Sequence, residues 1–117
     1  MSYDRITRIS EEIKKELSMI IKNDIKDPRL SEIVTVVGVS VTKDLRYAKT
    51  FISVLGDSQA KTNSITALKS AAGFIRHEIG ERVKLRYTPE FIFELDESIE
   101  HGIHIAKILN DIKEEQK

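Results

Sequence analysis

The sequence predicts an α+β protein in which a three-stranded mixed sheet carries its helices on one face. Three segments place apolar residues at steps of three or four, and three others are β-branched or alternate apolar with polar residues. A strand that rejoins a sheet through a helical connection lies parallel to its predecessor, so the third strand makes the sheet mixed. The expected order is helix 4–25, strand 33–42, strand 47–55, broken helix 62–83, strand 85–95 and helix 98–113.

The first helix is expected to bury one apolar stripe. It ends at Asp27-Pro28-Arg29, because proline disfavours a helical conformation in the residue before it. The stripe consists of Ile6, Ile9, Ile13, Leu17, Ile20 and Ile21.

A hairpin is expected next. Alternating valines indicate the strand over residues 33–42, where Gly38 is a candidate bulge position. The polar residues 43–46 then turn the chain into residues 47–55, in which apolar and polar side chains again alternate.

Residues 62–83 predict one amphipathic helix that is interrupted at residues 71–73. Capping side chains are available at residues 62–64. The apolar stripe continues through the interruption, so both halves face one core. A glycine inside a helix costs about 1 kcal/mol relative to alanine, so Gly73 is expected to let the axis kink and another backbone approach. The alternative is that Gly73 only avoids a steric clash where the helix packs against a strand, with no ligand involved.

The last part of the chain is expected to supply one strand and one helix. Phenylalanine and leucine side chains alternate within residues 85–95, and Pro89, which lacks a backbone N–H, must lie at an edge or a bulge. Residues 98–113 carry a further helical stripe, and residues 114–117 are expected to fray. That stripe consists of Ile99, Ile103, Ala106, Leu109 and Ile112.

The length of 117 residues is that of one domain, so residues 1–117 are expected to form a single domain and a monomer. The chain has no cysteine, which excludes disulfides, thiolate zinc sites and cysteine nucleophiles and fits a reducing compartment. It shows neither the apolar run of a signal peptide nor the ~20 apolar residues that span a bilayer. We expect a cytoplasmic protein without a membrane partner.

Charge is unevenly distributed although the formal net charge is zero. Residues 43–86 carry nine basic and four acidic side chains, whereas residues 90–117 carry three basic and eight acidic ones. Basic residues flank the small residues at the helix junction 71–73, and such a junction can bind a phosphate backbone, so this segment predicts an RNA-binding surface. The alternative is that these charges only form an ordinary solvated face. The candidate RNA-binding residues are Lys43, Arg46, Lys69, Ala71, Ala72, Gly73, Arg76, Arg82, Lys84 and Arg86.

Aromatic and titratable residues add no further site at this stage. Tyr47 and Tyr87 could stack on bases, but sheet aromatics are more often core residues, so they are left out of the set. Residues 77–81 resemble the zinc-binding motif H-E-x-x-H, but Glu81 stands where the motif has its second histidine, so the ligand set that begins with His77 is incomplete. His101 and His104 stand near acidic residues without a complete ligand set. We therefore expect no catalytic activity, metal, cofactor or small-molecule substrate.

The β-α-α-β core with small residues between its helices resembles the type II KH fold, whose usual hinge is a GXXG loop. Here residues 70–73 read SAAG, so the first glycine is absent. That departure resembles the ribosome-binding factor A family over about residues 5–105. Four further segments support the resemblance in their order and spacing: IKDPRL at 25–30, DLRYAK at 44–49, GFIR at 73–76 and LRYTPE at 85–90.

The resemblance implies a type II KH-like fold and a bacterial, non-enzymatic assembly factor. It implies binding to the free small ribosomal subunit and its rRNA late in maturation, with support of rRNA processing or folding, notably at low temperature. The family's Ala-X-Gly kink matches residues 71–73, and its N-terminal basic positions match Arg5 and Arg8, which could otherwise balance acidic neighbours. A general KH-like RNA-binding module and a protein-interaction domain remain as alternatives.

Overall fold

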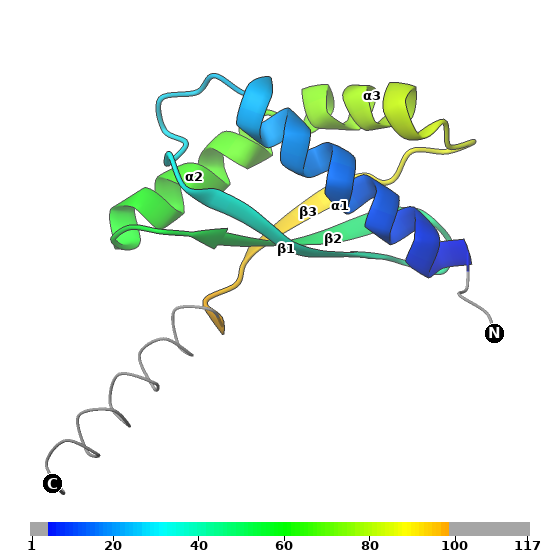
Figure 1. The fold of residues 1–117 in the computed structure, drawn as a ribbon, viewed down its shortest axis with the longest axis horizontal. Coiled ribbons are helices and arrows are strands. Elements are labelled where there is room, and N and C mark those ends of the chain that lie inside the picture. Colours follow the sequence, from blue (N-terminus) through cyan, green and yellow to red (C-terminus); the bar gives the residue numbers. More distant parts are fainter. Residues whose placement is uncertain (1–4, 99–117) are drawn as a thin grey trace, which may run out of the picture.

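The computed structural model of this chain describes residues 5–98, which form three helices and three strands (Figure 1). The order confirms the expected succession as far as the third strand. The last expected helix, apart from its first residue, and the tail 114–117 lie outside the described residues. The elements are α1 (Arg5–Asn23), β1 (Val34–Val41), β2 (Tyr47–Val54), α2 (Ser58–Ser70), α3 (Ala72–Val83) and β3 (Glu90–Leu95).

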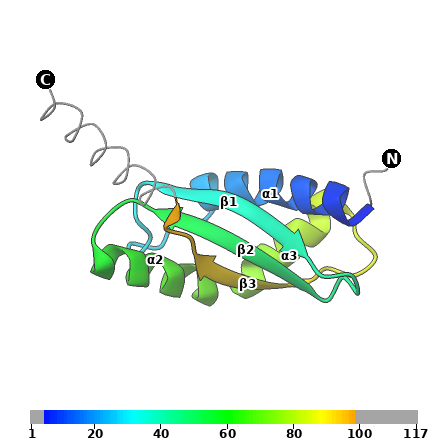
Figure 2. The same ribbon diagram turned by 90° about the horizontal axis from the view of Figure 1, so that it is seen from below.

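The predicted mixed sheet is confirmed. β2 is its central strand, antiparallel to β1 and parallel to β3. The β1–β2 register shifts between Val36 and Gly38, so a bulge forms where the glycine suggested one. All three helices lie on one face of the sheet, as expected (Figure 2). None of the helices within residues 5–98 is long and apolar enough to cross a membrane.

The core lies between the helices and the inner face of the sheet. The stripe of α1 is buried from Ile9 to Ile21, and the alternating inner residues of β2 are buried opposite the helices. Because α2 and α3 share this core, the two halves of the interrupted helix do face one interior. The largest contributions come from Ile13, Leu17, Ile20, Ile52, Leu68, Ile75 and Ile79, all fully buried.

Two predicted boundaries were wrong. α2 begins at Ser58, four residues before the expected start, because the Asp57 side chain caps the helix by accepting a hydrogen bond from the Ala60 N–H at 2.8 Å. β3 begins only at Glu90, whose N–H donates to the Arg46 carbonyl at 2.8 Å. Pro89 directly before it has no N–H to offer, so the residues that precede it form a loop instead of a strand.

The interruption between α2 and α3 falls at Ala71. This residue has φ −91° and ψ 5°, and its N–H donates to the carbonyls of both Ala67 and Leu68. This conformation lies in the bridge region, which is sparsely populated but open to residues other than glycine. The predicted interruption within residues 71–73 is confirmed, but the residue at the break is Ala71 and not Gly73, which lies in the first turn of α3.

Candidate nucleic-acid interface

A hollow of about 540 Å³ lies between α3 and the loop 84–89. Gly73, Arg76 and Arg86, all predicted from the sequence, line it together. The Arg76 Nε–H donates to the carbonyl of Thr88 at 3.1 Å, so one edge of the guanidinium is fixed against the loop. The remaining N–H groups of Arg76 are available to an anion in this hollow.

A second hollow of about 460 Å³ adjoins the first, because Arg76, Tyr87 and Thr88 line both. Its far side is formed by the β1–β2 turn, which brings Arg46 opposite Arg76. Within residues 5–98, no carboxylate oxygen lies within 4.0 Å of a side-chain nitrogen of Arg46, Arg76 or Arg86. These three cations are therefore not neutralised by direct ion pairs there.

The β1–β2 turn is organised by Asp44. One carboxylate oxygen accepts hydrogen bonds from the Thr42 hydroxyl at 2.7 Å and from the Arg46 N–H at 3.1 Å. These hydrogen bonds, the Thr42 one first, hold the pKa of Asp44 below its ordinary value. The carboxylate thus fixes the backbone that presents Arg46.

Arg5 and Lys43 extend the positive surface toward the start of α1. Both line a smaller hollow with Leu45, and Leu45 also borders the hollow that contains Arg46. The start of α1, the β1–β2 turn and the loop 84–89 lie at one end of the molecule (Figures 1 and 2). We call this surface the basic end; it consists of Arg5, Lys43, Arg46, Arg76 and Arg86.

The other predicted residues do not join the basic end. Arg82 forms ion pairs with Asp24 at 2.8 Å, Glu78 at 3.2 Å and Glu16 at 3.8 Å, and thereby connects α3 to α1. Arg8 lies on α1 beside two acidic residues. Lys69 is in the last turn of α2, and Lys84 ends α3 with a left-handed backbone at φ 54°. Neither lysine lines the hollows that contain Arg5, Arg46 or Arg76, although Lys84 begins the loop 84–89.

Gly73 is exposed in the first turn of α3. A Cβ atom placed on it meets nothing within 4 Å, so Gly73 is not needed to avoid a steric clash with a neighbouring element. Ala71 and Ala72 beside it are half-buried against the core. The helix junction therefore offers an open backbone surface at the hollow that contains Arg76.

The segment before β1 is held against this junction by Arg29. Its guanidinium binds the Asp27 carboxylate at 2.7 Å and donates to the Ser70 hydroxyl at 3.2 Å. The hydrogen bonds from Arg29 lower the pKa of Asp27. The end of α2 is thereby joined to a segment 41 residues earlier in the chain.

Sequence reasoning missed the exposed aromatic residues at this surface. Tyr87 is 67% exposed, with the Arg86 guanidinium carbon 5.7 Å from its ring centroid, and Tyr47 is 40% exposed. Phe74 follows Gly73 and is 44% exposed. Pro89 was the feature of the sequence that could have revealed the exposure of Tyr87. It shortens β3, so Tyr87 belongs to a loop and not to a sheet face.

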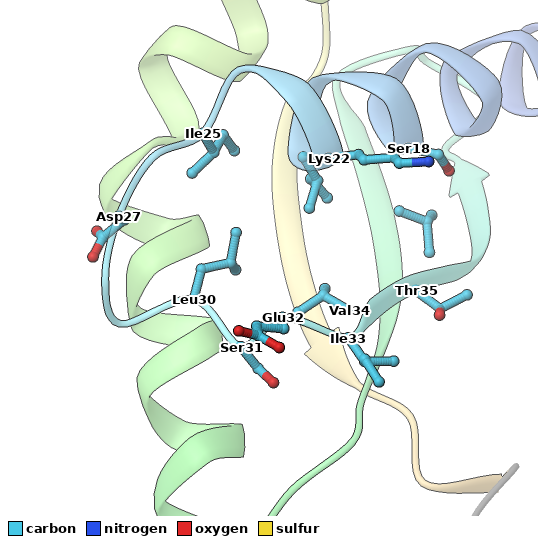
Figure 3. Close-up of a pocket in the computed structure, with 12 residues that line it drawn as sticks. Ser18, Lys22, Ile25, Asp27, Leu30, Ser31, Glu32, Ile33, Val34 and Thr35 are labelled. Carbon is cyan, nitrogen blue, oxygen red and sulfur yellow. The ribbon is translucent and has the colours of Figure 1, made fainter.

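A different hollow, of about 480 Å³, lies between α1, the segment before β1, and β1 itself (Figure 3). Half of its twelve lining residues are aliphatic, including Ile25, Leu30 and Val34, and the other half are polar or charged. None of the predicted RNA-binding residues lines it, so it is separate from the basic end.

Comparison with known proteins gives a consistent result. The family model described as Ribosome-binding factor A matches residues 5–109. A Ribosome-binding factor A from Clostridium novyi is 59% identical over 117 residues, which is 100% of this chain and 97% of that protein.

Two related structures share the fold. The solution NMR structure of a candidate ribosome binding factor A from Thermotoga maritima is 33% identical, with a TM-score of 0.70, over 80% of this chain and 89% of that one. A homology model of the Thermus thermophilus factor, fitted into a cryo-EM map of a 30S complex with that factor, is 21% identical. It gives a TM-score of 0.56 over 74% of this chain and 93% of that one.

Proposed function

Since the chain belongs to the ribosome-binding factor A family, we propose that it binds the free small ribosomal subunit through rRNA late in that subunit's maturation. It supports rRNA processing or folding there, notably at low temperature, without catalysing a reaction. It acts in the cytoplasm, where the subunits mature, as a monomer whose residues 1–117 form a single domain. The Thermus thermophilus factor placed in a map of a 30S complex supports the choice of the small subunit as partner.

The observation that carries the proposal is the position of Arg76. It lies with Gly73 and Arg86 in one hollow and with Arg46 in the next, so two adjoining hollows hold three cations, and only the first hollow reaches the helix junction. Glu81 also lines the first hollow, and Asp44 and Glu90 also line the second. Cations that contact phosphates release condensed counterions, which is the main source of affinity for nucleic acids. A phosphate backbone is the polyanion that suits such a row of separated charges.

The proposed RNA path follows from these contacts. Phosphates lie along Arg76 and Arg46, and the backbone passes over Gly73, where no side chain intervenes. A base stacks on the exposed ring of Tyr87, because base–aromatic stacking needs only an accessible ring face. This path favours single-stranded or loop RNA, whose bases are free to stack.

Gradient sedimentation of a lysate, followed by detection of this chain, tests the proposed partner. We expect the protein in the fractions of free small subunits and little of it in those of assembled ribosomes. Binding to unrelated RNA as tight as binding to small subunits would instead indicate a general KH-like module. Retention on protein partners with no dependence on salt would indicate a protein-interaction domain.

A further inference from the structure

The face of the sheet opposite the helices is crossed by no element within residues 5–98 (Figure 2). The outer residues of β2 alternate with its buried ones, so Tyr47 and Phe51 point away from the core. Leu55 and Ile33, joined by a backbone hydrogen bond, continue this face and are 58% and 56% exposed. Ile92 on β3 is 38% exposed.

These five residues, Ile33, Tyr47, Phe51, Leu55 and Ile92, define the open sheet face. Ile92 pairs with Lys49 and is therefore a diagonal neighbour of both Tyr47 and Phe51. The strip follows β2 from Tyr47 to Leu55, a length of about 26 Å at 3.3 Å per residue. Lys49 and Ser53 stand between its apolar residues on β2, and Ile92 on β3 connects Tyr47 with Phe51 beside Lys49. Exposed apolar side chains gathered in this way are typical of a surface that is covered in the functional molecule.

The chain leaves β3 at the Leu55 end of the strip. Leu95 pairs with Ile52, and the Asp96 N–H donates to the Ile52 carbonyl at 2.7 Å. The Asp96 carboxylate then accepts from the Ser98 N–H at 2.8 Å, two residues on, as the N-cap residue of a helix does. Glu97 is 3.8 Å from the Lys61 ammonium group, which fixes the exit beside α2.

We propose that residues 99–113 lie across the open sheet face as an amphipathic helix. The helix begins at the Leu55 end and runs back toward Tyr47, with its apolar stripe against the strip. Fifteen helical residues span about 22 Å, close to the length of the strip. The stripe consists of Ile99, Ile103, Ala106, Leu109 and Ile112.

Two further observations favour this occupant over a separate protein. The match to the family model continues to residue 109, so most of this segment belongs to the sequence pattern of the family. The segment is also covalently held at one end of the strip, and an attached segment binds at a high effective concentration.

Spin labelling of the full chain tests the proposal, and the lack of native cysteine allows single labels. A label at Thr35→Cys lies beside the strip, on the exposed side of β1 next to Ser53, whereas the control label at Glu12→Cys lies on the exposed side of α1. We expect the Thr35 label to abolish the methyl NMR signals of Ile103 and Leu109, and the Glu12 label to leave them intact.

A pair of variants in the segment checks specificity. Leu109→Glu should release the helix and restore the Ile103 signal, whereas Asn110→Glu should leave that signal suppressed. Signals that persist with the Thr35 label overturn the proposal. Signals lost only when spin-labelled protein is mixed with isotope-labelled, spin-free protein also overturn it, because a second copy is then the occupant.

Discussion

The hydroxyl oxygen of Thr88 lies 2.8 Å from the point that a Cβ atom on Gly80 would occupy. The loop 84–89 therefore rests directly on the backbone of α3. Pro89, fully buried, follows at once and starts the return into the sheet. This contact, together with the hydrogen bond from Arg76 to the Thr88 carbonyl, sets the distance between the arginines of α3 and those of the loop.

Gly80→Ala should lower the free energy of unfolding by about 1 kcal/mol or more, because the added methyl group overpacks a contact that has no room. The loss should appear although alanine is the better helix former. Urea unfolding measures it. In a Thr88→Ala background the same change should cost nothing, and an equal cost in both backgrounds would show that Thr88 is not the obstacle.

Gly73→Ala should have the opposite effect on stability. The new methyl group meets no atom within 4 Å, so the better helix propensity of alanine should raise the free energy of unfolding by roughly 0.5–1 kcal/mol. Affinity for small subunits should fall about tenfold, which corresponds to 1.4 kcal/mol, because the methyl group holds the RNA backbone away. A stabilised variant with unchanged affinity would remove Gly73 from the binding surface.

Tyr87→Ala should weaken RNA binding by roughly 1–3 kcal/mol, the range for loss of one stacked base. Tyr87→Phe keeps the ring and should bind nearly as well as the parent protein. Fluorescence anisotropy with a single-stranded rRNA fragment compares the two variants. If both variants lose affinity equally, the hydroxyl group and not the ring makes the contact.

The periodicity of the sequence was enough to predict the fold, because burial of the α1 stripe and of the inner β2 residues depends on spacing alone. The positions where helices and strands begin depended on individual hydrogen-bonding groups, which the spacing of apolar residues does not reveal. Asp57 extended α2 toward the N-terminus through one side-chain hydrogen bond, and Pro89 shortened β3 through a missing donor.

The binding surface could be predicted only in part, for a related reason. Charge counting finds cations, but it does not show which of them are already paired. Arg76 and Arg82 are both basic residues of α3, yet only Arg82 forms ion pairs with carboxylates. Its partners are Glu16 on α1, Asp24 just after α1, and Glu78 on α3. Tyr87 was discounted as a sheet aromatic because the loop that exposes it was read as a strand.

The β1–β2 turn should become less stable in acid. Hydrogen bonds hold the pKa of Asp44 below its ordinary value, so its contribution to stability is present above the pKa of the unfolded chain and is lost as the pH falls through the folded-state pKa. An NMR titration of the Asp44 carboxyl group should show this, and Thr42→Val should raise its pKa. A pKa unaffected by Thr42→Val would contradict the assigned cause.

The most direct test compares Arg76→Gln with Arg82→Gln in the salt dependence of binding to purified small subunits. The Arg76 variant should bind more weakly and lose about one unit of the slope of log affinity against log salt, and its stability should fall less than that of the Arg82 variant, since it loses only the exposed hydrogen bond to the Thr88 carbonyl. The Arg82 variant should keep that slope and unfold more easily, since it loses the ion pair with Glu78 and those with Glu16 and Asp24 that connect α3 to α1. An unchanged affinity and slope for Arg76→Gln would contradict RNA binding by the basic end.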